Sequence, residues 1–580
     1  MPSSHHSIPD SRARAIRAIA ESSNRAGDGH ADGYEPGGRH PDGFEPEPAA
    51  RACVPVLTDR TPVLGLMDLD GLSAAFERLN AAFVSQRDVL HAVACKAVPV
   101  RALLHRYAEA GAGCEVASSG ELELALAAGF TPERIVFDSP AKTWTELRRA
   151  VDLGVSINVD NFEELARLDT LLGERRRGHS AGAGQPAPAS ARSEVPGSAP
   201  TGSEVPSPAS ARIGIRINPQ SGTGAIGALS TATETSKFGI GLADPDAREK
   251  LIEAYLARPW LNQVHVHSGS QGISLDRAAV GVRAAVDLAQ EINARAASDS
   301  DASDPTTLSD ARAVSDRRRI TRIDIGGGLS VNFEGEDVTP TFAEYRAVLE
   351  EQVPELFDFD IVTEFGRALL AKAGTILTRV EYAKTTGDRR IAMTQAGVQV
   401  ATRTAYAPAD WPLRILPFTA DGEPKTAEAT PTDVAGPACF SGDLLARDRM
   451  LPRLDAGDLV AVPETGAYYF SNPFSYNLLP RVPVYGYRAA GASTVEGAVG
   501  AGSEGTAQQS EETVPQSAGA APRPGDDALQ FFLIRRGQSI DDVLAEAGGS
   551  ELQSLNTPTE QSLSTPTEPS PSTPAEQGSI

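Results

Sequence analysis

The chain has 580 residues, of which 77 are acidic and 53 are basic, so its formal net charge is −24. Such an acidic surface repels phosphate backbones and anionic lipid headgroups, which argues against nucleic-acid and membrane partners. Hydrophobic residues make up 41% of the chain, enough for a large core, and the four scattered cysteines argue against a disulfide framework or a zinc site. Because no apolar run is long enough to span a bilayer and no signal-type leader is evident, we expect a cytoplasmic protein.

Five stretches of biased composition interrupt the chain. They hold too little apolar surface to offset the entropy of ordering, so we expect them to be disordered. The stretches are an N-terminal tail (1–50), insertions at 175–211, 296–317 and 490–526, and a C-terminal tail (548–580).

Residues 51–70 include a strand-like run that we expect to pair with the C-terminal part of the chain. Between residues 71 and 375, short β-branched runs alternate with amphipathic helical stretches such as 119–130 and 143–154. There are eight runs: 89–95, 113–118, 134–139, 155–160, 212–218, 262–267, 321–326 and 359–365. Strand–helix alternation is typical of a parallel sheet, and eight units favour an α/β fold closed into a (β/α)8 TIM-like barrel. A doubly wound open sheet is the alternative.

After residue 375 the pattern changes. Strand-like runs follow one another through Pro- and Gly-containing turns, without helical stretches between them. The runs are 374–386, 389–403, 458–470 and 481–488. They predict a C-terminal all-β domain spanning 376–489 and 527–547.

Charged, imidazole and glycine-rich positions gather where the eight predicted strands end. In a (β/α)8 barrel these carboxyl ends form the active-site face. Each residue also has a purely structural interpretation, since a lysine after a strand is often solvated, a glycine run can be a plain loop and a carboxylate can serve a salt bridge. The set is Lys96, Glu115, Arg216, His267, Gly326, Gly327, Gly328, Glu364 and Arg367.

The functional interpretation of this set is a pyridoxal-phosphate (PLP) site. A partly desolvated lysine amine can form a Schiff base, which would be the role of Lys96. Glycines after the seventh strand let backbone N–H groups cradle a phosphate. His267 suits a flat cofactor ring, and a carboxylate such as Glu364, aimed at a pyridine nitrogen, keeps that nitrogen protonated. His265 and His267 share a strand face and could bind metal, but no third ligand is placed to complete the site, so no metal is expected.

Eight segments of the chain resemble motifs of the fold-type III PLP decarboxylases, which include the diaminopimelate, ornithine and arginine decarboxylases and have an alanine racemase-like barrel. The resemblance covers roughly residues 60–490 apart from the insertions. The segments are HAVACKA, CEVASSGELELALAAGF, SKFGI, HVHSGSQ, IDIGGGL, TEFGR, GPACFSGD and TGAYYFSNPFSYN.

This resemblance implies roles for individual residues. Lys96 would form the Schiff base, Glu364 would contact the pyridine nitrogen, and Cys439 would act in catalysis. Arg367, Arg403 and Phe440 would lie near the substrate. The resemblance also implies a homodimer whose active sites form between two subunits, and an amino acid as the small-molecule substrate. The implied cofactor-binding residues are Lys96, Glu115, Arg216, His267, Ser270, Gly326, Gly327, Gly328, Glu364, Arg367 and Tyr468.

The chain departs from the family at the position after the motif cysteine. Relatives have an acid there that contacts the distal amine of the substrate, whereas this chain has Phe440. A phenylalanine cannot neutralise an ammonium group.

The motifs as a whole lead us to expect a PLP-dependent amino-acid decarboxylase, closest to the diaminopimelate decarboxylases. The alternatives are a related PLP enzyme with another amino-acid substrate or reaction, such as a racemase or an enzyme of specialised metabolism, and a non-enzymatic PLP-binding protein.

Overall fold

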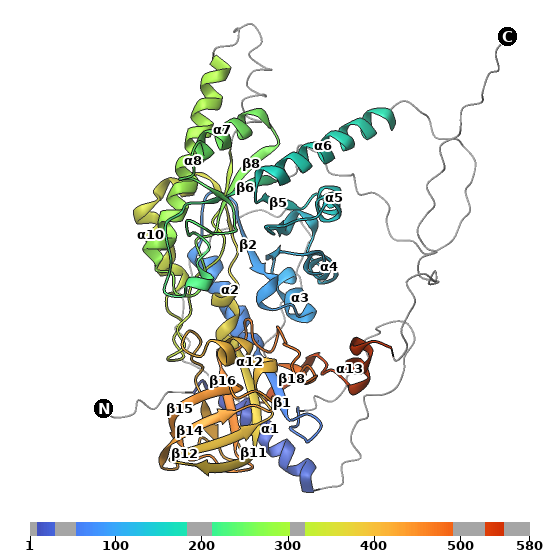
Figure 1. Cartoon of the computed structure of the whole chain (residues 1–580), viewed down its shortest axis with the longest axis vertical. Helices are drawn as coiled ribbons and strands as arrows, with labels where there is room; N and C mark the ends of the chain where they lie inside the picture. Colours follow the sequence, from blue (N-terminus) through green and yellow to red (C-terminus); the bar gives the residue numbers. More distant parts are fainter. Residues whose placement is uncertain (1–7, 29–53, 183–211, 302–319, 491–527, 550–580) are drawn as a thin grey trace, which may run out of the picture. The chain divides into compact units, whose positions relative to one another are not determined.

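The eight predicted runs form parallel strands that close into a barrel in the computed structural model (Figure 1). The strands β5 and β6 pair with each other, as do β10 and β2, so the sheet has no free edge. This closure confirms the (β/α)8 TIM-like barrel and excludes the open sheet. The barrel strands are β2 (Val89–Ala94), β3 (Gly113–Val116), β4 (Ile135–Phe137), β5 (Ser156–Val159), β6 (Ile213–Asn218), β8 (Leu261–Val266), β9 (Arg322–Asp324) and β10 (Asp360–Thr363), and the short β7 (Ile240–Gly241) extends β6.

The structure describes residues 8–28, 54–182, 212–301, 320–490 and 528–549. The chain divides into two units, Met1–Gly537 and Gln538–Ile580. The described part of the second unit contains α13 (Ile540–Ala547), which begins with a capping box formed by Ser539 and Asp542. The expected disorder at 1–7, 29–50, 183–211, 302–317, 491–526 and 550–580 lies outside the described residues.

Helices connect the barrel strands and cover their outer face (Figure 1). Local signals explain several boundaries: Thr143 and Glu146 form a capping box at the start of α5, and Gly154 ends that helix in the left-handed region. The helices are α2 (Leu69–Ala82), α3 (Arg101–Glu109), α4 (Ser119–Ala127), α5 (Trp144–Leu153), α6 (Phe162–Gly182), α7 (Ala247–Ala257), α8 (Leu275–Asp301), α10 (Phe342–Gln352) and α11 (Arg367–Leu370). Among the described helices, none is long and apolar enough to cross a membrane.

A second sheet follows the barrel, in the order β15-β14-β12-β11-β1-β17-β18, with β16 pairing with β11 and β13. Its strand β1 (Val63–Asp68) comes from before the barrel and pairs antiparallel with β11 and parallel with β17. The other strands are β11 (Gly374–Thr386), β12 (Arg389–Thr394), β13 (Leu416–Phe418), β14 (Ala429–Ala435), β15 (Leu444–Pro452), β16 (Leu459–Pro463), β17 (Val484–Ala489) and β18 (Leu529–Arg535). This sheet domain therefore contains chain from both sides of the barrel.

The second domain is not all-β, which corrects the prediction. The run 389–403 was expected to be one strand, but β12 ends at Thr394 and the kinked helix α12 (Val398–Tyr406) follows. A carboxylate distant in the sequence caps this helix: Asp443 accepts a hydrogen bond from the backbone N–H of its first residue, Val398 (2.5 Å). Asp443 also accepts one from the backbone N–H of Ala438 (2.7 Å). No local cap bond is present at Gly397.

Residues 10–28 also differ from the expected disordered N-terminal tail, because they form helix α1 (Asp10–Asp28). Ile16 and Ile19 of this helix are fully buried with Leu64, Leu377 and Phe418 of the sheet domain. Similarly, residues 175–182 continue α6 and residues 296–301 continue α8, where insertions were predicted.

The burial of α1 predicts that its apolar face contributes to stability. Ile16→Ala should lower the free energy of unfolding by about 2–5 kcal/mol, because it removes buried methyl groups and leaves a cavity. Urea unfolding followed by circular dichroism measures this change.

Glu21→Ala, on the exposed face of the same helix, is the matched control and should change stability by about 0.5 kcal/mol or less. Equal effects of the two substitutions would contradict the docking of α1.

Candidate active site

Lys96 lies on a short 3-10 turn, η1 (Cys95–Ala97), directly after β2. Its Nζ donates hydrogen bonds to both carboxylate oxygens of Glu115, at 2.7 and 2.6 Å. The register of the two strands pairs Ala94 of β2 with Glu115 of β3, which places the carboxylate beside the turn. Adjacent parallel strands thus build this ion pair.

The second domain fixes the backbone of the Lys96 turn. The carbonyl of Lys96 accepts a hydrogen bond from Asn472 Nδ2 at 2.6 Å. The carbonyl of Ala97 accepts from the Tyr468 N–H at 3.0 Å and from Ser471 Oγ at 3.1 Å. The lysine is therefore held between a barrel strand and a loop of the sheet domain.

Burial and opposite charge act against each other in the Lys96–Glu115 pair. Glu115 is fully buried, and this burial raises the pKa of its carboxyl to about 7 even though Lys96 opposes the shift. Burial alone would lower the pKa of Lys96, but the carboxylates of Glu115 and Glu364 and the phenol of Tyr468 outweigh it, so the pKa is raised. The pair consequently retains one proton over a wide pH range, and the lysine side chain is still 43% exposed.

The glycine loop after β9 packs tightly against the loops after β8 and β10. A methyl group on Gly327 would overlap the carbonyl oxygen of Glu364, and one on Gly328 would overlap that of Gly269. Gly326 and Gly328 also have positive φ angles of 66° and 100°, which favour glycine. No side chain fits here, so the backbones of the three loops come into direct contact.

Hydrogen bonds join these loops to the predicted histidine. The Gly327 N–H donates to His267 Nδ1 at 3.0 Å, so that nitrogen is the acceptor and carries no proton. Burial lowers the pKa of His267 well below its ordinary value, with the cations Arg216 and Lys96 acting in the same direction. Ser270 lies in the same loop as His267, after β8, and its Cα lies next to Gly328.

Two arginines share two aromatic rings at the site. The guanidinium of Arg367 lies 4.5 Å from the ring centre of Trp411 and 4.7 Å from that of Tyr468, and the guanidinium of Arg403 lies 5.0 and 4.5 Å from the same rings. Arg367 is 3% exposed, and its Nε and Nη1 have no hydrogen-bond partner among the described residues. Burial lowers the pKa of Arg367 to about 10, and Arg403 acts in the same direction. An anion bound here would accept hydrogen bonds from the unpaired N–H groups of Arg367 and would offset the positive charge of both arginines.

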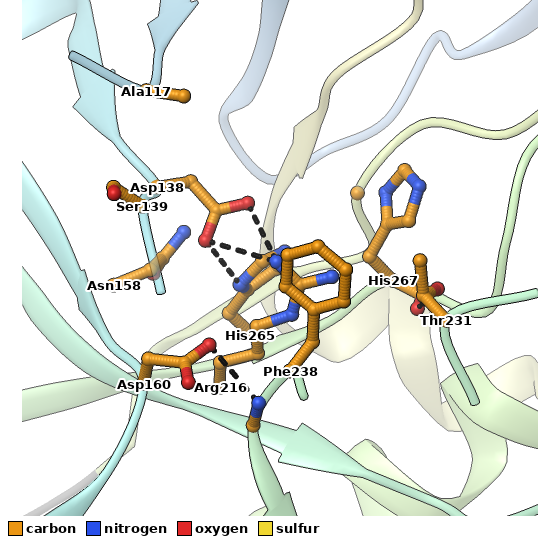
Figure 2. A network of polar contacts seen from close by, with 12 residues as sticks. Ala117, Asp138, Ser139, Asn158, Asp160, Arg216, Thr231, Phe238, His265 and His267 are labelled. Atoms are coloured by element: carbon orange, nitrogen blue, oxygen red, sulfur yellow. Dashed lines mark hydrogen bonds and ion pairs between the residues drawn. The ribbon is translucent and has the colours of Figure 1, made fainter. Parts of the chain in front are cut away.

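A polar group fills the barrel below the rim. Figure 2 shows the Asp138 carboxylate facing both Arg216 and His265, with Phe238 beside them. Arg216 Nη1 donates to Asp138 Oδ2 at 3.1 Å, and its guanidinium lies 4.5 Å from the Phe238 ring centre. Glu364, at the end of β10, is also buried, and its Oε1 has no hydrogen-bond partner among the described residues.

Cys439 and Phe440 lie in the second domain, in an aromatic cluster formed by Tyr406, Phe440, Phe474 and Tyr476. Phe440 stacks on Tyr406 with ring centres 5.2 Å apart, and Phe474 stacks on Tyr476 at 6.4 Å. Cys439 is exposed, and its backbone N–H donates to Asn477 Oδ1. The described contacts of these two residues are thus within their own domain, and their place in an active site stays a prediction.

The structure brings most of the predicted residues to one end of the barrel, and it adds residues that the sequence analysis did not select. Asp138 follows β4 in the same way that Lys96 follows β2, so the strand-end rule could have found it. His265 was considered only as a metal ligand. Trp411 lies in a loop, where no sequence signal marked it.

Comparisons with known proteins agree with this geometry. Residues 69–304 match the family "Pyridoxal-dependent decarboxylase, pyridoxal binding domain". The diaminopimelate decarboxylase of Vibrio cholerae serotype O1 is 30% identical over 381 residues, which cover 66% of this chain and 76% of that protein. That of Helicobacter pylori is 26% identical over 434 residues, covering 73% and 90%. The structure of the Helicobacter pylori enzyme complexed with L-lysine has a TM-score of 0.59 at 24% identity and covers 84% of this chain and 97% of that chain.

The close packing of the glycine loop predicts the effect of a single methyl group. Gly327→Ala should destabilise the protein by about 1–3 kcal/mol, because the loop must move away from the backbone of Glu364. Thermal unfolding followed by calorimetry tests this.

Gly335→Ala serves as the control, since a methyl group there meets open space, and it should change stability by about 1 kcal/mol or less. An unchanged melting temperature for Gly327→Ala would count against the packing described.

Proposed function

The chain belongs to the pyridoxal-dependent decarboxylases, and from this premise we propose that it decarboxylates an α-amino acid with Lys96 as its Schiff-base lysine. The observation that carries the proposal is the Lys96–Glu115 pair, held at the barrel end where the glycine loop and Glu364 meet. Pyridoxal phosphate is the cofactor of this family, and the chain is a PLP-dependent carboxy-lyase.

The described residues fit this cofactor. When bound, pyridoxal phosphate supplies a conjugated ring that accepts the electron pair left by departing CO2. Its phosphate requires an anion site, for which Arg367 offers buried N–H groups without a partner. Its ring nitrogen requires a facing acid, for which Glu364 offers the unpartnered Oε1. The glycine loop carries no side chains, so its backbone N–H groups can approach a phosphate closely.

Lys96 must lose its proton before its amine can react. Glu115 is the nearest acceptor, with both oxygens within 2.7 Å of Nζ, and its pKa of about 7 suits a proton acceptor near neutral pH. The hydrogen bonds from Tyr468 and Asn472 to the turn hold the amine in place while its charge changes. We assign Glu115 the role of proton acceptor on this basis.

The other predicted residues hold the cofactor. Gly326, Gly327 and Gly328, together with Ser270, Arg367 and Tyr468, would bind its phosphate. His267, neutral because burial lowers its pKa, would stack on its ring. Arg216, held by its contacts with Asp138 and Phe238, would support the side of the cofactor site opposite His267. Glu364 would hold a proton at the ring nitrogen.

The proton that replaces CO2 would come from Lys96 Nζ or from Cys439 Sγ. Cys439 is exposed in the second domain, so it would act on a second copy of the chain in a homodimer. The exposed aromatic cluster around Phe440 would enter the same site.

The aromatic cluster favours one class of substrate. The Helicobacter pylori relative was crystallised with L-lysine, an amino acid with a distal ammonium. In this chain Phe440 is surrounded by Tyr406 and Tyr476 and offers no negative charge to such a group. The proposed substrate is therefore an amino acid without a distal ammonium, with Arg403 beside Arg367 available for a carboxylate.

The Schiff-base assignment predicts the site of covalent attachment. Borohydride reduction of the PLP-loaded protein, followed by mass spectrometry of its peptides, should place the cofactor mass on Lys96. Lys96→Arg keeps the positive charge beside Glu115 but should lose the attachment and lower the rate of CO2 release by more than about 10³-fold. A cofactor mass on another lysine of the parent protein would refute the assignment.

The substrate class is tested by measuring CO2 release from meso-diaminopimelate, lysine, ornithine, arginine and apolar amino acids. The parent protein should prefer substrates that lack a distal ammonium. Phe440→Glu should raise kcat/KM for distal ammonium substrates by on the order of 10-fold, because a charge-assisted hydrogen bond contributes about 1.5–3 kcal/mol.

Ser441→Glu adds the same charge one residue away, on an exposed side chain, and should leave this preference unchanged. Efficient turnover of meso-diaminopimelate by the parent protein would contradict the proposed substrate class. A change of chirality without CO2 release would indicate a racemase instead.

A further inference from the structure

A buried group below the active-site rim contains one residue, His265, that the proposed mechanism does not use. It consists of Asp138, His265 and Glu364, at the ends of β4, β8 and β10. His265 is fully buried, with Nδ1 3.5 Å from Asp138 Oδ1 and Nε2 3.7 Å from Glu364 Oε2. Each ring nitrogen faces a different carboxylate, so the imidazole bridges two acids.

Neither nitrogen of His265 has a hydrogen-bond partner at normal distance among the described residues. An unpaired polar group in a barrel interior is costly, so these nitrogens are expected to be used when the site is complete. Figure 2 shows the imidazole directed at Asp138, beside Arg216.

The surroundings of His265 carry more acids than bases. The five carboxylates lie in or directly after five different strands, whereas the lysines and the arginine come from three positions. The groups that face the bridge are Lys96, Glu115, Asp138, Lys142, Asp160, Arg216, His267, Asp324 and Glu364. An excess of negative charge in a buried space favours the uptake of protons.

The distribution of protons follows from these contacts. Burial disfavours the charged form of Asp138, but His265 and Arg216 outweigh it and hold the pKa of this carboxyl well below its usual range. Burial lowers the pKa of His265. Burial and the carboxylates of Asp324 and Asp138 raise the pKa of Glu364 well above its usual range.

One arrangement agrees with all three directions. His265 Nδ1–H donates toward the ionised Asp138, and His265 Nε2 accepts from the protonated Glu364. The other oxygen of Glu364, Oε1, then remains without a partner among the residues that the structure describes.

We propose that His265 is a positioning residue that connects Asp138 to Glu364 and sets how strongly Glu364 keeps a proton on the ring nitrogen of the cofactor. The inference rests on the proposed function, in which Glu364 faces that nitrogen. When Glu364 gives its proton to the nitrogen, it becomes a carboxylate facing Nε2. The imidazole then takes up one proton from solvent at Nε2, and the two flanking carboxylates stabilise the imidazolium.

The test follows the proton on the ring nitrogen directly. The protein is loaded with PLP labelled with 15N at that nitrogen, and its 15N NMR signal is recorded as a function of pH. In His265→Gln, which can donate one hydrogen bond but cannot take up a proton, the pH at which the nitrogen loses its proton should fall by about one unit or more. An unchanged midpoint in this variant, with the cofactor still bound, would overturn the inference.

Gln263→Leu is the matched control, because Gln263 is fully buried on the same face of the same strand and bonds to Asn158. It should lower thermal stability and leave the NMR midpoint unchanged. An equal shift in this control would show a general effect of repacking the barrel and would also overturn the proposal.

Asp138→Asn tests the same bridge from its other end and serves if His265→Gln does not fold. It should move the midpoint in the same direction, since the imidazolium loses one of its two carboxylates, and no movement would overturn the proposal. Failure of the proposed function gives a different result: the PLP-loaded parent protein would then release no CO2 from any of the amino acids tested, whatever the NMR midpoints of the variants.

Discussion

The inside of this barrel is filled with charged groups, and burying them imposes the arrangement of the site. An unpaired charge in such a space costs several kcal/mol, so each one needs a partner on a neighbouring strand. Glu115 has Lys96, and Asp138 has Arg216. Because β2 and β3 are adjacent, and only β5 separates β4 from β6, the closed sheet fixes the distance between the partners in each pair. The positions of Lys96 and Glu364 then follow from the barrel itself.

The second domain completes what the barrel begins. Its loop at residues 468–472 donates hydrogen bonds to the backbone carbonyls of the Lys96 turn. The guanidinium groups of Arg367 and Arg403 lie over the rings of its Tyr468 and Trp411. The barrel supplies Lys96 and Arg367, and the second domain places Arg403, Trp411 and Tyr468 beside Arg367. The order of the chain reinforces this dependence, since β1 precedes the barrel in the sequence and pairs with β11 and β17, which follow it.

The sequence was sufficient to predict the eight barrel strands and most residues at their ends, because parallel strands bury both faces and leave a clear apolar run before each polar end. It was insufficient for α12, whose alternating valines resemble a strand and whose first turn is bound by Asp443 from a distant loop. For α1 the local signal existed, since Ala15, Ile16, Ile19 and Ala20 lie on one helical face, but the glycine-rich segment after it dominated the composition. The bridging role of His265 depends on three strands at once and has no local signature.

The placement of β1 between β11 and β17 has a consequence for how the protein is made. A ribosome releases β1 and α1 long before it releases the strands on either side of them. During that interval the two segments have only each other, because the other strands of their cluster are not yet made, and contacts between such distant segments form slowly. The barrel can assemble as it emerges, but the site cannot form until translation has passed the end of the second sheet. Synthesis of this protein should therefore depend more on chaperones than synthesis of a barrel alone, with the exposed amino-terminal segment as the part they protect.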